Sequence, residues 1–84
     1  MEEILVAEVK PLDDMTMLLT FANGEKRVYD AAPLLKMPVF QPLRDDVIFR
    51  AAKISRGVVT WMDGEIDVAP ETMYRDSFRY DTIA

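Results

Sequence analysis

Two short turn signals constrain this chain more than any other feature of its sequence. Asn23-Gly24 and Asp63-Gly64 are dipeptides that favour the positive φ angles of a type I′ turn, and each lies between segments suited to extended backbone. They predict two β-hairpins, over residues 15–29 and 58–68. A chain built on such hairpins folds around antiparallel strands.

The segments outside the hairpins predict one more strand and two short helices. Residues 4–10 begin as an apolar run and end before a proline, which favours a strand followed by a turn. Asp30 is a suitable N-cap for a helical turn over residues 31–36, and Pro70 is typical of the first position of a helix over 70–77. The predicted fold is α+β: a small antiparallel sheet of two β-hairpins plus an N-terminal strand, with two short helices.

Three segments carry weaker signals. Residues 37–46 place two prolines among apolar side chains and predict a loop that lies against the core. Residues 47–52 suit either a brief helix capped by an aspartate or the start of a strand, and both readings stay open. The tail, residues 78–84, has no strong pattern and is expected to fray at its end. The side chains that we expect to be buried are Leu5, Leu19, Phe21, Leu34, Val59 and Trp61.

Length and composition limit the chemistry that the chain can carry. Its 84 residues are enough for a single domain, residues 1–84, and half of them are hydrophobic, as in ordinary globular proteins. The sequence has no histidine and no cysteine, which excludes disulfide scaffolds, thiolate chemistry, the usual zinc sites and histidine-dependent acid–base catalysis. We therefore expect a protein that is not an enzyme and that carries no cofactor.

The charge balance predicts the kind of partner. Fifteen acidic and ten basic side chains give a formal net charge of −5, which repels nucleic-acid phosphates and anionic lipid headgroups. A protein partner, basic in charge, is expected instead of nucleic acid or a membrane. No apolar run approaches the roughly 20 residues of a membrane span, and the start Met1-Glu2-Glu3 is acidic where a secretory signal is basic. These features favour a cytoplasmic protein.

The most unusual stretch of sequence surrounds the second turn. Asp63, Glu65 and Asp67 alternate around it and are the oxygen ligands that Mg²⁺ or Ca²⁺ prefers, but the fixed spacing of a calcium loop is absent. Acidic side chains at a hairpin tip more often serve turn geometry and solubility, so no metal site is predicted. The candidate interaction surface adds neighbouring aromatic and methionine side chains and comprises Trp61, Met62, Asp63, Glu65, Asp67 and Tyr74.

Two alternatives to a protein-interaction module remain. One is a small-ligand-binding or minor enzymatic domain with a pocket near the Trp61 hairpin and the following helix, using carboxylate, phenol or guanidinium groups. The other is a nucleic-acid regulator, because arginines and aromatic side chains interleave near the C-terminus in the manner of a stacking platform. Net charge disfavours this reading. The interleaved residues are Tyr74, Arg75, Phe78, Arg79 and Tyr80.

The small core also predicts association. With no disulfide or metal available, burial against another chain is an accessible route to stability. Residues 4–9 contain few charges and, as an edge strand, would offer a template for pairing. We expect a homodimer or a partner that covers a sheet edge or an apolar face near Trp61 or a methionine. The competing expectation is a monomer whose edge is covered by residues 37–46 or by the tail.

Several segments spread over nearly the whole chain carry a resemblance to a known family. Each is common alone, and their order makes the set specific. The segments are Val6-Ala7-Glu8-Val9-Lys10-Pro11, Leu19-Thr20-Phe21-Ala22-Asn23-Gly24-Glu25, Tyr29-Asp30, Pro33-Leu34-Leu35, Phe40, Leu43, Phe49, Val58, Trp61 and Gly64-Glu65-Ile66-Asp67-Val68-Ala69-Pro70-Glu71-Thr72-Met73-Tyr74.

Together these segments resemble the small bacterial domain of unknown function 2442 (DUF2442). The resemblance implies a compact α+β domain with no established reaction and no catalytic residues to carry over. Similar modules stand alone or are fused to a helix-turn-helix domain, and their genes often lie beside another small protein in what looks like a toxin–antitoxin or two-subunit pair. The resemblance thus implies an interaction module, as an antitoxin-like or accessory subunit. We expect the 84 residues to leave no room for the DNA-binding half.

Overall fold

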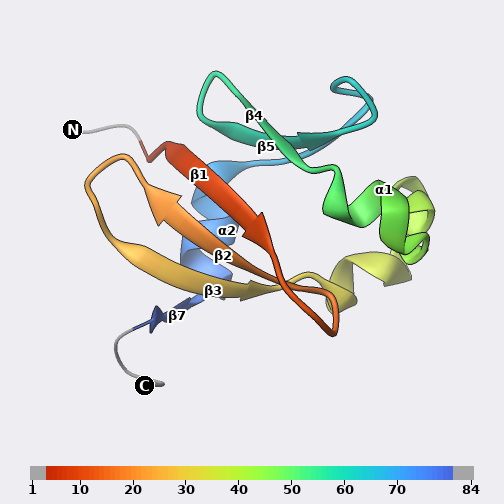
Figure 1. Ribbon diagram of the computed structural model, residues 1–84, viewed down its shortest axis with the longest axis horizontal. Coiled ribbons are helices and arrows are strands. Elements are labelled where there is room, and N and C mark those ends of the chain that lie inside the picture. The colour runs from red at the N-terminus through yellow and green to blue at the C-terminus, as the bar shows by residue number, and fades with distance from the viewer. Residues whose placement is uncertain (1–3, 81–84) are drawn as a thin grey trace.

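The computed structural model describes residues 4–80. This part of the chain contains seven strands, which form two separate antiparallel sheets (Figure 1). The strands are β1 (Val6–Pro11), β2 (Thr16–Phe21), β3 (Lys26–Asp30), β4 (Lys53–Ser55), β5 (Val58–Trp61), β6 (Ile66–Val68) and β7 (Phe78–Arg79).

Four short helices complete the described chain. The first two are 3₁₀ helices and the last two are α-helices. The helix over residues 32–36 and the helix over 70–76 confirm the two that the sequence predicts. The helices are η1 (Ala32–Lys36), η2 (Pro38–Arg44), α1 (Asp46–Arg50) and α2 (Pro70–Asp76).

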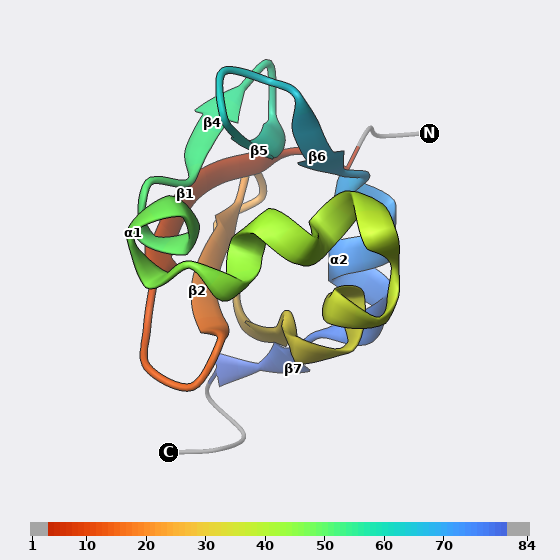
Figure 2. The ribbon, with the colours of Figure 1, turned by 90° about the vertical axis from the view of Figure 1, so that its right-hand side faces the viewer.

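The antiparallel α+β fold is confirmed, with the strands divided between two sheets. The first sheet has the order β1-β2-β3-β7 and the second the order β4-β5-β6. After β3 the chain passes through η1, η2 and α1 before it reaches β4, so the two sets of hairpins do not share a ladder. Helix α2 covers the inner face of the first sheet, behind β1, β2 and β3 in Figure 1 and opposite them in Figure 2.

Both predicted hairpins form, but their turns differ in detail from the prediction. At the first turn only Gly24 has a positive φ, of 89°. The Gly24 N–H donates to the Phe21 carbonyl at 2.8 Å, and the Asn23 side chain accepts from the Glu25 N–H at 2.9 Å. The prediction of a left-handed Asn23 is therefore wrong: its side chain fixes the loop, and glycine alone takes the left-handed position.

At the second turn the left-handed stretch is longer than predicted. Asp63 and Gly64 have φ angles of 56° and 90°, and Met62 before them has a φ of 55°. The Gly64 N–H donates to the Trp61 carbonyl at 3.2 Å, so the reversal begins one residue earlier than the dipeptide indicates. The hairpin pairs β5 with β6.

Two more hairpins join strands that the sequence analysis left unpaired. The turn between β1 and β2 places Asp14 and Met15 at φ angles of 58° and 61°. The turn between β4 and β5 places Arg56 and Gly57 at 52° and 80°. Neither Asp14-Met15 nor Arg56-Gly57 is a strong turn dipeptide by itself, so pairing across the sheet decides these conformations.

One hydrophobic cluster lies between the sheets and the helices. Five of the six side chains predicted to be buried belong to it. Leu5 is the exception: it is half-buried, because it lies at the margin over the Gly57 backbone. The five confirmed core residues are Leu19, Phe21, Leu34, Val59 and Trp61.

The segments with weak signals prove more regular than expected. Residues 38–44 form the 3₁₀ helix η2 instead of the predicted loop, because its prolines are compatible with short local turns while Phe40 and Leu43 face the core. Within 47–52 the chain is helical through Arg50, and the Asp45 side chain caps α1 by accepting from the Val47 N–H at 2.9 Å.

The C-terminal tail is predicted to have no strong pattern and to fray at its end, and its first two residues form a strand that the sequence does not indicate. Phe78 and Arg79 form β7, which pairs with Val28 and Arg27 of β3. The rest of that prediction, over residues 81–84, lies outside the described residues. Among residues 4–80, no helix is long and apolar enough to cross a membrane.

Strand β1 lies at the edge of the first sheet, as the sequence predicts. The start of this edge is not open, because the Val6 N–H donates to the Gly57 carbonyl at 2.8 Å. The covering segment is therefore the turn between β4 and β5, a third possibility beside residues 37–46 and the tail.

Candidate functional site

The structure places Trp61 in the core, so its assignment to the candidate interaction surface is wrong. Its side chain is 1% exposed, on the central strand of the second sheet. The indole Nε1–H donates to the Phe49 carbonyl oxygen at 3.0 Å, and the two rings stack with centroids 6.4 Å apart. A residue held on both its apolar and polar sides has nothing left to offer a partner.

The tip of the β5–β6 hairpin is exposed, as a surface site requires. Met62, Asp63 and Glu65 all reach solvent, and Asp67 points outward from β6 between two buried neighbours. Within residues 4–80, no three acidic, histidine or cysteine side chains gather closely enough to hold a metal ion. The acidic residues of the predicted surface are therefore exposed at the tip, but Trp61 is buried and cannot act as its apolar anchor.

A shallow pocket lies beside this hairpin, where the alternative reading expects a ligand site. Its volume is about 160 Å³, against roughly 300–1,000 Å³ for typical small-molecule sites. The pocket is too small to enclose an ordinary substrate. Its lining residues are Ala51, Lys53, Thr60, Trp61, Met62 and Asp63.

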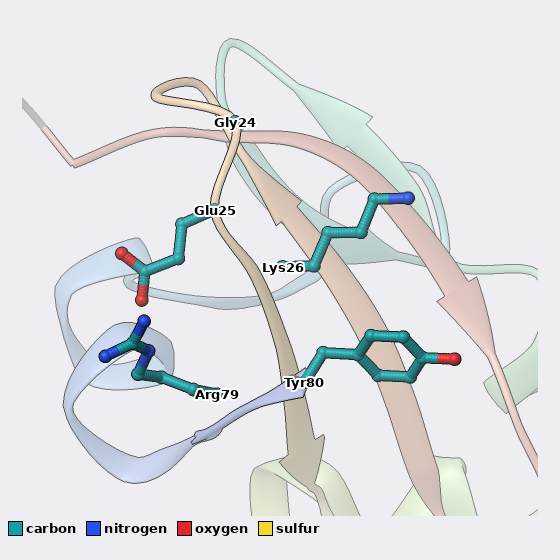
Figure 3. A pocket seen from close by; sticks show the side chains of 5 residues that line it. All are labelled: Gly24, Glu25, Lys26, Arg79 and Tyr80. Carbon is teal, nitrogen blue, oxygen red and sulfur yellow. The ribbon is translucent and has the colours of Figure 1, made fainter. Parts of the chain in front are cut away.

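A larger hollow of about 340 Å³ lies where the pairing of β3 with β7 ends (Figure 3). Glu25 and Arg79 extend on one side of the two strands, and Lys26 and Tyr80 extend on the other. The hollow therefore wraps around the end of a sheet and separates its charged groups onto two faces. Of its five lining residues, only Glu25 and Arg79 point toward each other (Figure 3).

Tyr74, the last residue of the predicted surface, belongs to a polar cluster on the inner side of β3. Its hydroxyl donates to the Glu25 carboxylate at 2.8 Å, and the Arg27 guanidinium lies 4.4 Å from its ring centroid. The same guanidinium forms an ion pair with Glu25 and donates to Ser77 Oγ at 2.7 Å and to the Ser77 carbonyl at 2.8 Å. The structure therefore does not bring Tyr74 to the Trp61 hairpin.

The charges of this polar cluster stabilise one another. The hydrogen bond from Tyr74 and the ion pair with Arg27 lower the pKa of Glu25. The hydrogen bond to the Glu25 carboxylate raises the pKa of Tyr74. Both shifts favour the carboxylate and the neutral phenol at pH 7, which is the pair that the hydrogen bond needs.

The polar cluster fastens secondary structure together. It joins β3 to the end of α2 and to the residue that precedes β7, and Ser77 closes it by donating to the Tyr74 carbonyl at 3.0 Å. Among the described residues, no buried side-chain nitrogen or oxygen lacks a hydrogen-bond partner. A network whose groups are all satisfied holds structure in place and leaves no group free for substrate.

The side of the first sheet that faces away from α2 carries a different surface, and we call this side the outer face. Lys10 pairs with Leu18, Leu18 with Val28, and Val28 with Phe78, so these four residues form one row across all four strands. Leu18 and Val28 are half-buried, and Phe78 is 63% exposed. Residues directly opposite each other share a face, so the row is a continuous apolar strip that ends in a lysine.

Polar side chains flank this apolar strip on the outer face. Thr20 pairs with Lys26 on one side of the strip, and Thr16 pairs with Asp30 on the other. Tyr80 lies beyond Phe78 and extends to the same side of the strands as Lys26 (Figure 3). Helix α2 lies on the opposite face of the sheet in both ribbon views (Figures 1 and 2).

Sequence reasoning missed the outer face because β7 is only two residues long. The alternation of residues 15–21 does place Met17, Leu19 and Phe21 on the inner face, and it leaves Leu18 on the other. The signal that completes the strip, the pairing of Phe78 with Val28, depends on contacts 50 residues apart. No local pattern in a short tail encodes such a pairing.

Comparison with known proteins gives one result. No curated protein matches this chain, and no solved structure matches it either. A family model, described as a protein of unknown function (DUF2442), matches residues 6–79, which is nearly the whole chain. The match includes the strands of both sheets, the polar cluster and the outer-face strip. The chain belongs to the DUF2442 family.

Proposed function

We propose that this chain is a non-enzymatic protein-interaction module that binds its partner through the outer face of the first sheet. The observation that carries the proposal is the apolar strip of Leu18, Val28 and Phe78, whose outermost ring is 63% exposed. Exposed aromatic side chains next to aliphatic ones are typical of protein contacts, and flanking polar groups are typical of their rims.

Two observations favour this function over a ligand-binding or enzymatic one. The pocket at the Trp61 hairpin has about half the volume of the smallest usual ligand sites. The ionisable side chains of Glu25 and Arg27 are engaged in holding α2 and the residue before β7 to β3. The finer reading of an antitoxin-like or accessory subunit is supported by the family resemblance alone.

Matched variants test this function in the cells that make the protein. Phe78→Lys places a charge in the apolar strip, Met62→Lys changes the hairpin tip, and Val47→Lys changes an apolar side chain of α1 that is 78% exposed. We expect Phe78→Lys to lose the partner that co-purifies with the tagged wild type, while the other two variants retain it. Loss with Met62→Lys alone would instead assign binding to the hairpin tip.

A further inference from the structure

The charges beside the apolar strip are arranged to match a second copy of the same surface. Lys26 and Asp30 lie on β3, two residues before and two residues after Val28, and both are exposed on the outer face. A two-fold axis along the strip would bring Val28 against Val28, and Phe78 against Phe78, of the other copy. The same rotation would place each Lys26 opposite the other copy's Asp30.

The flanking threonines obey the same symmetry. Thr16 and Thr20 lie two residues on either side of Leu18 and share rows with Asp30 and Lys26. The rotation that matches lysine with aspartate therefore matches Thr16 with Thr20, so two small polar side chains meet. Lys10, at the β1 end of the strip, meets its own counterpart, and Glu8, which pairs with Thr20, lies on the same face two residues from it. Isologous interfaces require this kind of self-complementarity. We propose that the partner of the outer face is a second copy of this chain, packed sheet to sheet around that axis.

This inference rests on the proposed function, and the size of the face sets how strong the contact is. Four strands about 4.8 Å apart and five residues of about 3.4 Å each cover on the order of 300 Å², against about 800 Å² per partner in a standard interface. The dimer is therefore weak and depends on protein concentration. The net charge of −5 opposes it at low salt, and screening over about 8 Å removes most of that repulsion at physiological ionic strength.

Charge reversal tests the symmetry directly. The dimer contains two contacts between residue 26 of one copy and residue 30 of the other. In Lys26→Asp both contacts become Asp–Asp, and in Asp30→Lys both become Lys–Lys. Each variant alone should therefore weaken the dimer by roughly tenfold. An equimolar mixture of the two variants restores both attractive pairs and should dimerise as the wild type does. Sedimentation equilibrium at physiological salt, over roughly 10 μM to 1 mM, measures each case.

Asp30→Lys also removes a hydrogen bond within the chain, because Asp30 Oδ1 accepts from the Ala32 N–H at 3.0 Å. Lys26→Asp combined with Asp30→Asn avoids this loss, since asparagine keeps an acceptor oxygen. This double variant should recover part of the association that Lys26→Asp loses. Its recovery supports the proposal even if Asp30→Lys fails to fold.

The outcomes separate this inference from the proposed function. A wild type with the mass of one chain over the whole concentration range would overturn the homodimer, as would a Lys26→Asp variant that associates unchanged. If Phe78→Lys still loses a co-purified partner in that case, the outer face binds a different protein and the proposed function stands. If Phe78→Lys binds that partner as the wild type does, the proposed function fails as well.

Discussion

The indole of Trp61 donates a hydrogen bond to the carbonyl oxygen of Phe49, 12 residues earlier, at 3.0 Å. Phe49 is in α1 and Trp61 is in β5, so this one contact fastens α1 to the central strand of the second sheet. The stacked rings exclude water from the hydrogen bond. Both the apolar and the polar halves of the indole therefore contribute to stability.

Two substitutions at this position should separate those halves. Trp61→Phe keeps most of the apolar contact and leaves the Phe49 carbonyl with only the longer hydrogen bond from the Ala52 N–H at 3.4 Å, at a cost of about 0.5–1.5 kcal/mol in unfolding free energy. Trp61→Ala also opens a cavity and should cost about 3–5 kcal/mol. Urea unfolding measures both. Equal losses in the two variants would mean that the ring packing contributes little beyond the hydrogen bond.

Arg27 should hold β7 in place. Its side chain is 13% exposed, and replacing it with alanine removes the ion pair with Glu25 and both contacts with Ser77. Hydrogen bonds from charged groups contribute about 1.5–3 kcal/mol, and we expect a loss of that order in Arg27→Ala. Hydrogen exchange at the amides that pair β3 with β7 should accelerate more than exchange between β1 and β2.

The control for Arg27 is Arg75→Ala. Arg75 forms an exposed ion pair with its neighbour Asp76, and such pairs contribute little to stability because water and salt screen them, so Arg75→Ala should unfold much as the wild type does. Arg27→Lys adds a second test, since lysine keeps the charge but lacks the guanidinium fork that reaches both Ser77 oxygens. If Arg27→Lys is as stable as the wild type, charge and not geometry holds β7.

The parts of the fold that could be predicted are those specified by neighbouring residues. The Asn23-Gly24 and Asp63-Gly64 hairpins depend on local turn chemistry. The helices over residues 32–36 and 70–76 each have a proline in the first turn, and neither has a side-chain cap at its N-cap residue, which is Ala31 in the first and Ala69 in the second. The turns at Asp14 and Arg56 depend on strand pairing instead. Three non-glycine residues, Asp14, Met15 and Arg56, reach positive φ there because the sheet requires it, and the sequence carries little sign of that.

The candidate site was harder to predict than the fold. An exposed aromatic and a buried aromatic have the same local sequence signal, so Trp61 could be an interface anchor or a core residue until its neighbours were known. Phe78 presents the opposite case: it lies in a tail without periodicity and becomes a surface residue only through its pairing with Val28. Surfaces that are assembled from distant strands lie beyond local pattern analysis.

Acid should weaken the polar cluster through Glu25. Contacts with Tyr74 and Arg27 lower the pKa of this carboxyl in the folded chain below its ordinary value of 4.5. The folded state therefore gains stability from the carboxylate above the ordinary pKa, and that gain is lost as the pH falls through the lowered one. We expect Glu25→Gln to be less stable than the wild type at pH 7, with the difference narrowing on acidification.

The measurement for Glu25 is urea unfolding of both proteins at a series of pH values from neutral to acidic. Tyr74→Phe is a companion variant, because it removes the hydrogen bond that is the largest cause of the lowered pKa. It should reduce the pH dependence without abolishing it, since the ion pair with Arg27 remains. A constant difference between Glu25→Gln and the wild type at every pH would contradict the assignment.

Gly57 should be the least replaceable of the three glycines. All three have positive φ, of 89° at Gly24, 80° at Gly57 and 90° at Gly64, so alanine at any of them carries a conformational cost of about 1–3 kcal/mol. Only at Gly57 would the added Cβ also meet another side chain, 2.6 Å from Leu5 Cδ2 and 2.8 Å from Leu5 Cβ. At Gly24 and Gly64 nothing lies within 4 Å of that position.

Because the Leu5 Cβ cannot move away by a simple rotation of its side chain, the backbone of residue 5 must shift in Gly57→Ala. That shift strains the hydrogen bond from the neighbouring Val6 N–H to the Gly57 carbonyl, which joins the two sheets. We expect Gly57→Ala to lose more unfolding free energy than Gly24→Ala, and to accelerate hydrogen exchange at the Val6 amide while Gly24→Ala leaves it unchanged. Equal losses in the two variants would show that the left-handed backbone alone sets the cost, and that the contact between the sheets at Leu5 tolerates an extra methyl group.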